Sequence, residues 1–287
     1  MVALHRAQVV RVAVAVVALA AAVGGESSVG RALAEGGQQR TAVTAPAVPA
    51  AVPADAAAAP ADAPAAAADA STGIRPATYR SPVADVPERQ VLLGLPAVLS
   101  SDGSAVEVGY PDAPSTLTLF EDFRCSTTQG FESAQGATLA AMAAAHRVLI
   151  RYVLESSLDQ RLPGAGALQA TNAARAALAH GGFPLYHALL FANQPAEEAD
   201  GFTVDRLLDI ATAVPGLRGP AFDREVRGLW YRQWVAQAQQ AYDKAGVHFG
   251  TPSMLLNGQE VDLGTHPQLL SDPAALQSLV RSAAERG

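Results

Sequence analysis

The feature that most constrains the fold is a strand, a cysteine, a helix and a second strand in close succession. Residues 115–120 alternate apolar and hydroxyl side chains, which predicts a strand with one buried face. Cys125, the only cysteine, follows, and an Ala-rich segment with helical periodicity comes next. Residues 147–154 form an apolar run rich in β-branched and aromatic side chains, typical of a strand inside a sheet. This order predicts a βαβ unit with a parallel strand pair.

The position of Cys125 indicates a reactive thiol. Ser126 and Gln129 have the spacing of a capping box, so the helix should begin within a residue or two of the cysteine. The unpaired N–H groups and the positive dipole end of a helix stabilise a thiolate and lower the pKa of a thiol there. The hydroxyls of Ser126, Thr127 and Thr128 are expected to donate hydrogen bonds to the thiolate. The alternative is that Cys125 is a small buried hydrophobe.

The segment before the βαβ unit is predicted to add two short strands, at residues 91–96 and 105–108, with a turn between them. Residues 165–246 have a helical pattern throughout, which includes one long helix over residues 220–245. Trp230 and Trp234 lie four apart on this long helix and are predicted to be core residues.

The C-terminal part returns to strands. Residues 251–262 predict a β-hairpin whose turn is Asn257-Gly258, a strong hairpin signal. Asp272 followed by Pro273 predicts the start of a last helix. The predicted fold is therefore an α/β sheet interrupted by a helical insertion at about 165–246.

The N-terminal part is expected to lie outside the folded domain. Residues 1–34 contain an apolar run from Val12 to Val23, long enough for a signal peptide and short for a membrane span. We expect either a cleaved signal peptide or an uncleaved N-terminal anchor, and hence an exported protein. Residues 35–86 are rich in Ala and Pro and predict a disordered linker. The folded domain is expected over residues 87–287.

Charge and cysteine content exclude several classes of partner. The formal net charge is −7, and no run of Lys and Arg is present, so no nucleic-acid partner is expected. Membrane contact is expected only through the N-terminal segment. One cysteine cannot form an internal disulfide, and no Cys/His cluster has zinc-ligand spacing, so no metal or other cofactor is predicted.

The order of these elements resembles a DsbA-like member of the thioredoxin superfamily. Residues 120–125, Phe-Glu-Asp-Phe-Arg-Cys, are similar to the strand that leads into the family's active-site helix. Gly250-Thr251-Pro252, followed by an apolar strand and the Asn-Gly turn, is similar to the family's cis-proline loop. The helical insertion lies where the DsbA branch carries one. The resemblance covers roughly residues 90 to 287 and implies a thioredoxin-like fold with a helical subdomain inserted before the cis-proline strand.

The resemblance also implies a site and a class of substrate. The family's Cys-x-x-Cys motif is here Cys125-Ser126-Thr127-Thr128, so the attacking cysteine is kept and Thr128 occupies the resolving position. Cys125 and Thr128 are the expected catalytic positions; Ser126, Thr127, Thr251 and Pro252 are expected to bind substrate. The expected partners are protein or small-molecule thiols and disulfides, and a redox partner protein. A monothiol of this kind can act as an isomerase or reductase after release by another thiol. The alternative is a redox-inactive thioredoxin-fold module that binds proteins or acts as a chaperone.

Two other sites are weighed against this interpretation. A Cys/His hydrolase would need a histidine beside Cys125. The candidates are His146, His180, His187, His248 and His266, and His248 is the best placed because the fold should bring its loop toward the cysteine. Glu121 and Asp122 are adjacent on a strand and should point to opposite faces. One of them is a candidate for buried proton transfer, but a solvated strand end is the favoured prediction.

Overall fold

The predicted βαβ unit is present in the computed structural model, which describes residues 81–286. Strands β3 (Thr116–Asp122) and β4 (Leu149–Glu155) pair in parallel, and α2 (Ser126–Ala144) connects them. They form the centre of a six-stranded sheet with the order β1-β2-β4-β3-β5-β6. All the other strand pairs in this sheet are antiparallel. The fold is α/β and thioredoxin-like, as predicted.

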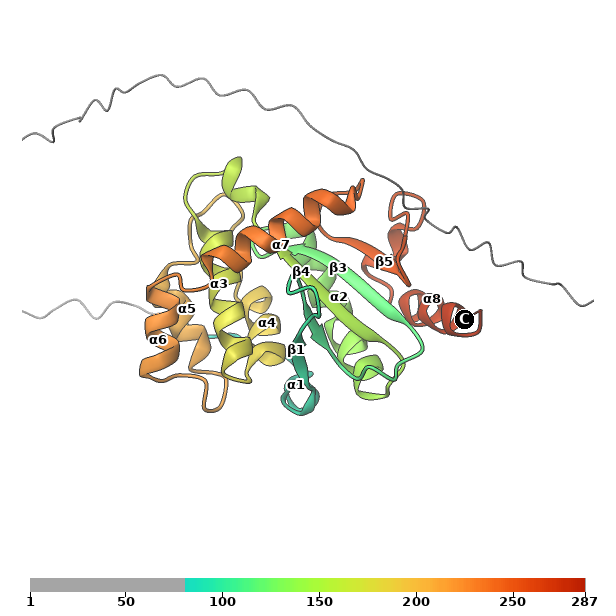
Figure 1. The fold of residues 1–287 in the computed structure, drawn as a ribbon, viewed down its shortest axis with the longest axis horizontal. Coiled ribbons are helices and arrows are strands. Elements are labelled where there is room, and N and C mark those ends of the chain that lie inside the picture. The colour runs from blue at the N-terminus through green and yellow to red at the C-terminus, as the bar shows by residue number, and fades with distance from the viewer. Residues whose placement is uncertain (1–80, 287) are drawn as a thin grey trace, which may run out of the picture. The chain divides into compact units, whose positions relative to one another are not determined.

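The remaining elements surround this centre (Figure 1). The outer strands are β1 (Ala97–Leu99), β2 (Val106–Val108), β5 (Ser253–Leu256) and β6 (Gln259–Glu260). The other helices are α1 (Arg89–Gly94), α3 (Gly166–Ala179), α4 (Phe183–Ala192), α5 (Val204–Ala211), α6 (Pro220–Arg227), α7 (Arg232–Ala245) and α8 (Pro273–Ala284). Two 3₁₀ turns, η1 (Ser157–Gln160) and η2 (Pro267–Leu270), complete the set. Helices α3 to α7 lie between β4 and β5 in the chain.

The two faces of the sheet are covered by different helices. Leu117 and Leu119 of β3 pack in the main core, which also contains residues of α2 and α4. Phe120 points to the other face, where its ring packs against Tyr242 of α7. Figure 1 shows α7 lying across the sheet, with α3, α4, α5 and α6 gathered at one side and α8 at the other. This alternation decides which helix each side chain of β3 meets.

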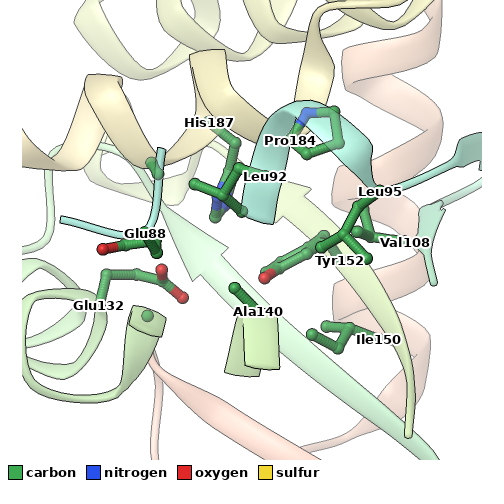
Figure 2. Close-up of a pocket in the computed structure, with 12 residues that line it drawn as sticks. Glu88, Leu92, Leu95, Val108, Glu132, Ala140, Ile150, Tyr152, Pro184 and His187 are labelled. Carbon is green, nitrogen blue, oxygen red and sulfur yellow. The ribbon is translucent and has the colours of Figure 1, made fainter. Parts of the chain in front are cut away.

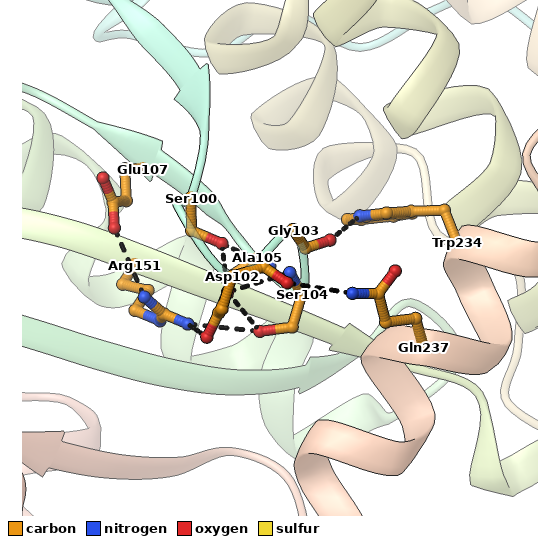
Figure 3. Close-up of polar contacts among 9 residues, drawn as sticks. All are labelled: Ser100, Asp102, Gly103, Ser104, Ala105, Glu107, Arg151, Trp234 and Gln237. Atoms are coloured by element: carbon orange, nitrogen blue, oxygen red, sulfur yellow. Dashed lines mark hydrogen bonds and ion pairs between the residues drawn. The ribbon is translucent and has the colours of Figure 1, made fainter.

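Polar side chains join the turn between β1 and β2 to the rest of the sheet (Figure 3). The Asp102 carboxylate accepts hydrogen bonds from Ser100 and Ser104 and forms an ion pair with Arg151 of β4. Trp234 of α7 donates its indole N–H to the carbonyl oxygen of Gly103 at 2.8 Å. The turn is therefore held to both the sheet and α7.

The predicted strand at residues 91–96 is wrong, because most of this segment forms helix α1. Leu92 and Leu95, three residues apart, are buried, whereas Val91 and Leu93 are exposed. A strand would instead place alternate residues on one face. The apolar run is thus buried with helical spacing.

The single long helix predicted over residues 220–245 is also wrong. It divides into α6 and α7 at Gly228, and Leu229 adopts a left-handed conformation with φ 48°. The buried side chain of Asn172 in α3 accepts the backbone N–H of Tyr231 at 2.9 Å, which fixes the start of α7. Trp234 is buried as predicted, but Trp230 lies in the break and is 63% exposed.

The C-terminal predictions are confirmed. β5 and β6 pair across the Asn257-Gly258 turn, where both residues have positive φ. The Asp272 side chain accepts the backbone N–H of Ala274 and caps α8, which begins at Pro273. The expectations for residues 1–80 lie outside the described residues. Within residues 81–286, no helix has the length and apolar character needed to cross a membrane.

Candidate functional site

Cys125 is the residue immediately before helix α2. It has extended backbone angles and occupies the N-cap position, so the predicted helix start beside the thiol is confirmed. The turn is fixed from both sides. The Cys125 N–H donates to the Asp122 carbonyl oxygen at 3.0 Å, and the Gln194 side chain donates to the carbonyl oxygens of Phe123 and Cys125 at 2.7 and 3.0 Å. The thiol is half-buried at the helix end.

The Thr251-Pro252 loop lies against the sulfur. The peptide bond between these residues is cis, and Pro252 is buried at the start of β5. Cys125 Sγ donates a hydrogen bond to the Thr251 carbonyl oxygen at 3.1 Å. The structure therefore brings Cys125 beside Thr251 and Pro252, although 126 positions separate Cys125 from Thr251 in the sequence.

The three hydroxyl residues after Cys125 have different surroundings. The Ser126 hydroxyl donates to the carboxylate of Glu197 at 2.6 Å, so it is not directed to the sulfur. Thr127 is exposed. Thr128 is fully buried, and its Oγ1 has no hydrogen-bond partner among the described residues. The hydrogen bonds expected between these hydroxyls and the sulfur are therefore absent from residues 81–286.

Glu197 is a site residue that the sequence analysis missed. Its Oε2 accepts both the hydroxyl and the backbone N–H of Ser126, the latter at 2.9 Å. These two hydrogen bonds hold the pKa of Glu197 below its ordinary value. The carboxylate thus caps the same helix end that carries Cys125. No local signal marks this residue, because it lies in the loop between α4 and α5, 71 positions after Ser126.

Arg124 holds this loop in place. Its guanidinium is buried and donates to the Glu197 carbonyl oxygen at 3.1 Å and to the Asp159 carboxylate at 2.8 Å. Asp159 also accepts the backbone N–H groups of Ala167 and Leu168 at the start of α3. The residue before the cysteine therefore joins the site to the helical insertion.

The prediction of a solvated strand end for Glu121 and Asp122 is wrong, because both side chains are fully buried. Asp122 accepts the N–H groups of Arg124 and Leu158 at 2.8 and 3.0 Å. It also lies opposite Glu155 in the parallel register. Burial, followed by the charge of Glu155, raises the pKa of Asp122 to about 8. Burial also raises the pKa of Glu155.

Glu121 points to the other face of the sheet and meets a buried histidine. Its Oε2 lies 2.8 Å from Nε2 of His187 in α4. Burial raises the pKa of Glu121 to about 8 and lowers that of His187. Glu132 of α2 joins them, and its pKa is raised well above the ordinary value by burial and then by Glu121. The sequence analysis did not connect these three residues.

Three other histidines form contacts away from the thiol. His248 pairs with Glu260 at 2.8 Å, and its side chain is 79% exposed. His146 pairs with Asp112, and His180 with Glu225. No histidine among residues 81–286 forms a hydrogen bond with Cys125, so the Cys/His hydrolase arrangement is not observed.

Comparisons with known proteins agree with this architecture. The sequence model of the thioredoxin family matches residues 101–272. No curated protein sequence matches the chain. Three solved structures illustrate the similarity in fold. The reduced disulfide bond oxidoreductase DsbG from Mycobacterium tuberculosis is 23% identical, with a TM-score of 0.54; the match covers 63% of this chain and 88% of that one.

The second is oxidised DsbA from Mycobacterium tuberculosis, with 23% identity and a TM-score of 0.53. The match covers 63% of this chain and 92% of that one. The third is oxidised BdbD from Bacillus subtilis, with 17% identity and a TM-score of 0.54. The match covers 67% of this chain and 98% of that one. At these identities the structures show the shared fold, and the family match covers most of the described residues. The chain therefore belongs to the thioredoxin family, with a DsbA-like fold.

Proposed function

We propose that the protein is an extracytoplasmic thiol–disulfide exchange protein that acts through the single nucleophile Cys125. The observation that carries the proposal is the position of Cys125 Sγ, half-buried at the start of α2 and 3.1 Å from the Thr251 carbonyl oxygen. A thiol, a helix N-terminus and a partly exposed backbone segment thus lie within one site. The chemistry is that of a disulfide exchanger with one thiol.

The proposed step forms a mixed disulfide. The Cys125 thiolate attacks one sulfur of a substrate disulfide, the Sγ–S bond forms, and the substrate S–S bond breaks to release the other sulfur as a thiolate. The chain contains no second cysteine that could resolve this intermediate. Release requires either a different thiol of the same substrate, which forms a new substrate disulfide and gives isomerisation, or two molecules of an external small thiol, which leave as their own disulfide and give reduction.

The helix end can receive the thiolate. Among the described residues, the N–H groups of Thr127 and Thr128 have no hydrogen-bond acceptor. Unpaired N–H groups at a helix start stabilise negative charge. A thiolate has no proton to donate to the Thr251 carbonyl oxygen. Ionisation therefore favours rotation of the Cys125 side chain, which brings the sulfur toward these N–H groups.

The Thr251 backbone supports binding of an extended peptide. In the thiol form its carbonyl oxygen accepts the Cys125 hydrogen bond. Formation of a mixed disulfide removes that donor and leaves the carbonyl oxygen available for a substrate N–H. The exposed Phe249 in the same loop offers an apolar contact. The site is thus suited to a peptide that lies beside the sulfur.

The location rests on the N-terminal sequence. The apolar run from Val12 to Val23 supports export. Either cleavage or anchoring by residues 1–34 would place the folded domain outside the cytoplasm, after a linker over residues 35–86. External thiols and a redox partner protein would then be the releasing partners.

One observation favours a second function, a redox-inactive module that binds proteins. Glu197 places a carboxylate at the start of α2, where it accepts the Ser126 N–H. A negative charge there opposes formation of a thiolate at Cys125. If this effect dominates, the Thr251 loop remains a peptide-binding surface without exchange chemistry.

Trapping of a mixed disulfide distinguishes the two functions. The full chain is incubated with a peptide disulfide at pH 7, and the adduct is followed by intact-protein mass spectrometry. The folded protein should form one adduct at Cys125 faster than the same protein unfolded in urea, because only the folded state provides the helix end. Cys125→Ser should form none. Equal or slower reaction of the folded thiol would support the redox-inactive module.

A further inference from the structure

Three titratable side chains meet inside the core, apart from the thiol site. Glu121 comes from β3, Glu132 from α2 and His187 from α4, and each is less than one-tenth exposed. Their ligand atoms all lie within 4.8 Å of one another, and the closest pair, Glu121 Oε2 and His187 Nε2, is 2.8 Å apart. The proposed exchange reaction uses none of the three.

Two oxygen atoms in this cluster have no hydrogen-bond partner among the described residues. Glu121 Oε1 and Glu132 Oε1 are buried and form no hydrogen bond with the described residues. No lysine or arginine within residues 81–286 forms an ion pair with either carboxyl group. Burial of polar oxygens without a donor or a cation is costly. Each carboxyl group of the cluster therefore has one oxygen without a donor, while the His187 ring is shared with Glu121 Oε2.

The neighbouring cavity adds a third carboxyl group. A cavity of about 10 Å³ is lined by Glu88, Glu132, His187 and Tyr152, among others. In Figure 2 the carboxyl groups of Glu88 and Glu132 lie next to each other, and His187 reaches in from α4. Gly136 leaves room for Glu88, since a Cβ at this position would lie 2.9 Å from Glu88 Oε1.

This arrangement also provides a path from the surface. A second hollow of about 280 Å³ borders Glu88 and Glu132 as well as Asp85. Glu88 is only partly buried. A cation can therefore meet Glu88 first and then reach the buried pair, which satisfies the requirement for an entry path.

The donor set and the spacing select the class of ligand. Zinc binds imidazole nitrogen and carboxylate oxygen at about 2.0–2.2 Å, so two ligand atoms on one tetrahedral ion lie roughly 3.4 Å apart. The present separations need only small side-chain movements to reach that value. An imidazole ligand favours a first-row transition metal over calcium or magnesium. Aromatic rings of Phe123, Phe183 and Phe191 surround His187 and form an apolar shell.

We propose that Glu121, Glu132 and His187 bind a divalent transition-metal ion, with zinc as the best fit and Glu88 as the candidate fourth ligand. The ion would join β3, α2 and α4, and so hold the sheet to the helical insertion just before the thiol site. Its role is structural, because the ligands are buried and Cys125 is not among them. The sequence did not predict this site, since its ligands are single residues on three separate elements.

Zinc titration of the chelator-treated full chain tests the proposal. Calorimetry should show one zinc ion per chain, and the melting temperature should rise with zinc and less with calcium. Glu132→Gln keeps the shape of the side chain and removes its charge, and it should weaken zinc binding at least about tenfold. Cys125→Ser and His248→Ala are the controls, and both should bind zinc as the wild type does.

A second readout requires no change in the cluster. In the wild-type protein labelled at its histidines, zinc should shift the NMR signals of the buried His187 ring and leave the exposed His248 unchanged. Three results would overturn the proposal: no binding at one ion per chain, loss of binding in either control variant, or shifts confined to exposed histidines. These results do not depend on the exchange reaction, so the metal site and the proposed function can fail separately.

Discussion

At the scale of single residues, Cys125 and Glu197 share one helix end. The carboxylate already accepts the N–H and the hydroxyl of Ser126, whereas the sulfur donates to Thr251. A thiolate and a carboxylate at the same N-terminus repel each other and draw on the same group of N–H donors. The reactivity of the thiol should therefore depend on the charge of Glu197.

Glu197→Gln should make Cys125 react faster. The glutamine carbonyl can still accept from Ser126, but the negative charge beside the helix start is removed. For two charges near a protein surface we expect about a threefold to tenfold faster alkylation at pH 7 and low salt. The measurement is the rate of iodoacetamide modification. Glu198→Gln changes the same charge at an exposed neighbour and is the matched control. An equal effect of both variants would show that the contact with Ser126 is irrelevant.

Thr128→Cys should convert the site into one that can hold an internal disulfide. Thr128 is buried one turn after Cys125, and its hydroxyl has no partner among the described residues, so a thiol can replace it at little cost. After mild oxidation the variant should lose both thiols to a maleimide assay. Thr127→Cys, at the exposed neighbouring position, should keep both thiols free. Retention of free thiols in Thr128→Cys would contradict the resolving geometry assigned to this position.

The site was predictable only where its residues carry a local pattern. Cys125 follows a strand, and Thr251-Pro252 precedes a hairpin, so the sequence indicates both. Glu197 has no such context, and its role arises because Arg124 and Gln194 hold its loop against α2. The burial of Glu121 was also unpredictable, since α2 and α4 cover it through tertiary packing. In the sequence, two acidic residues at a strand end have the same pattern whether or not helices cover them in the fold.

At the scale of elements, the errors have a common physical cause. An apolar run of about six residues is compatible with a short helix as well as with a strand. For α1, the burial of Leu92 and Leu95, three residues apart, favours the helix. The break between α6 and α7 depends on the left-handed Leu229 and on Asn172 from a distant helix. The hairpin and α8 were predictable, because Asn257-Gly258 and Asp272-Pro273 determine their ends locally.

The adjacent ends of β3 and β4 should make stability depend on pH. The pKa of Asp122 is raised to about 8 from an ordinary value of 3.8, so the folded protein holds a proton that the unfolded chain releases. The free energy of unfolding should therefore fall as the pH rises from about 4 to about 8, by on the order of a few kcal/mol. Urea unfolding at pH 5 and pH 8, with EDTA present, measures this loss.

Glu155→Gln separates this pair from the other titrating groups. It removes the charge that raises the pKa of Asp122, so the loss between pH 5 and pH 8 should be smaller than in the wild type. The charges of Asp159 and Arg161 also act on the Asp122–Glu155 pair, and the cluster of Glu121, Glu132 and His187 titrates as well. All these groups are present in both the wild type and the variant, so they do not account for a difference between the two. Glu198→Gln should keep the wild-type pH dependence. An unchanged loss in Glu155→Gln would contradict the coupling.

At the scale of the whole described domain, residues 81–88 connect its parts. The N–H of Ala84 donates to Asn193 Oδ1 at 2.8 Å, and Asn193 Nδ2 donates to the Ala84 carbonyl oxygen at 2.9 Å. Arg206 of α5 donates to Ser81 and to Asn193. The segment expected to be a linker up to residue 86 therefore binds the helical insertion before it enters α1. Sequence composition does not indicate that this segment binds the insertion, because the hydrogen bonds are made mostly by its backbone groups.

Asn193→Ala should loosen this connection. The side chain is 9% exposed, and its loss leaves the N–H and carbonyl groups of Ala84 without their partners, so we expect the free energy of unfolding to fall by about 2 kcal/mol. Urea unfolding measures the change, and limited proteolysis should cut more readily within residues 81–88. Asp85→Ala is the control in the same segment, because it removes an exposed ion pair with Arg89 and an exposed local hydrogen bond from the Val86 N–H, and should change the midpoint much less. Equal effects of the two variants would show that the Ala84–Asn193 pair does not hold the segment to the insertion.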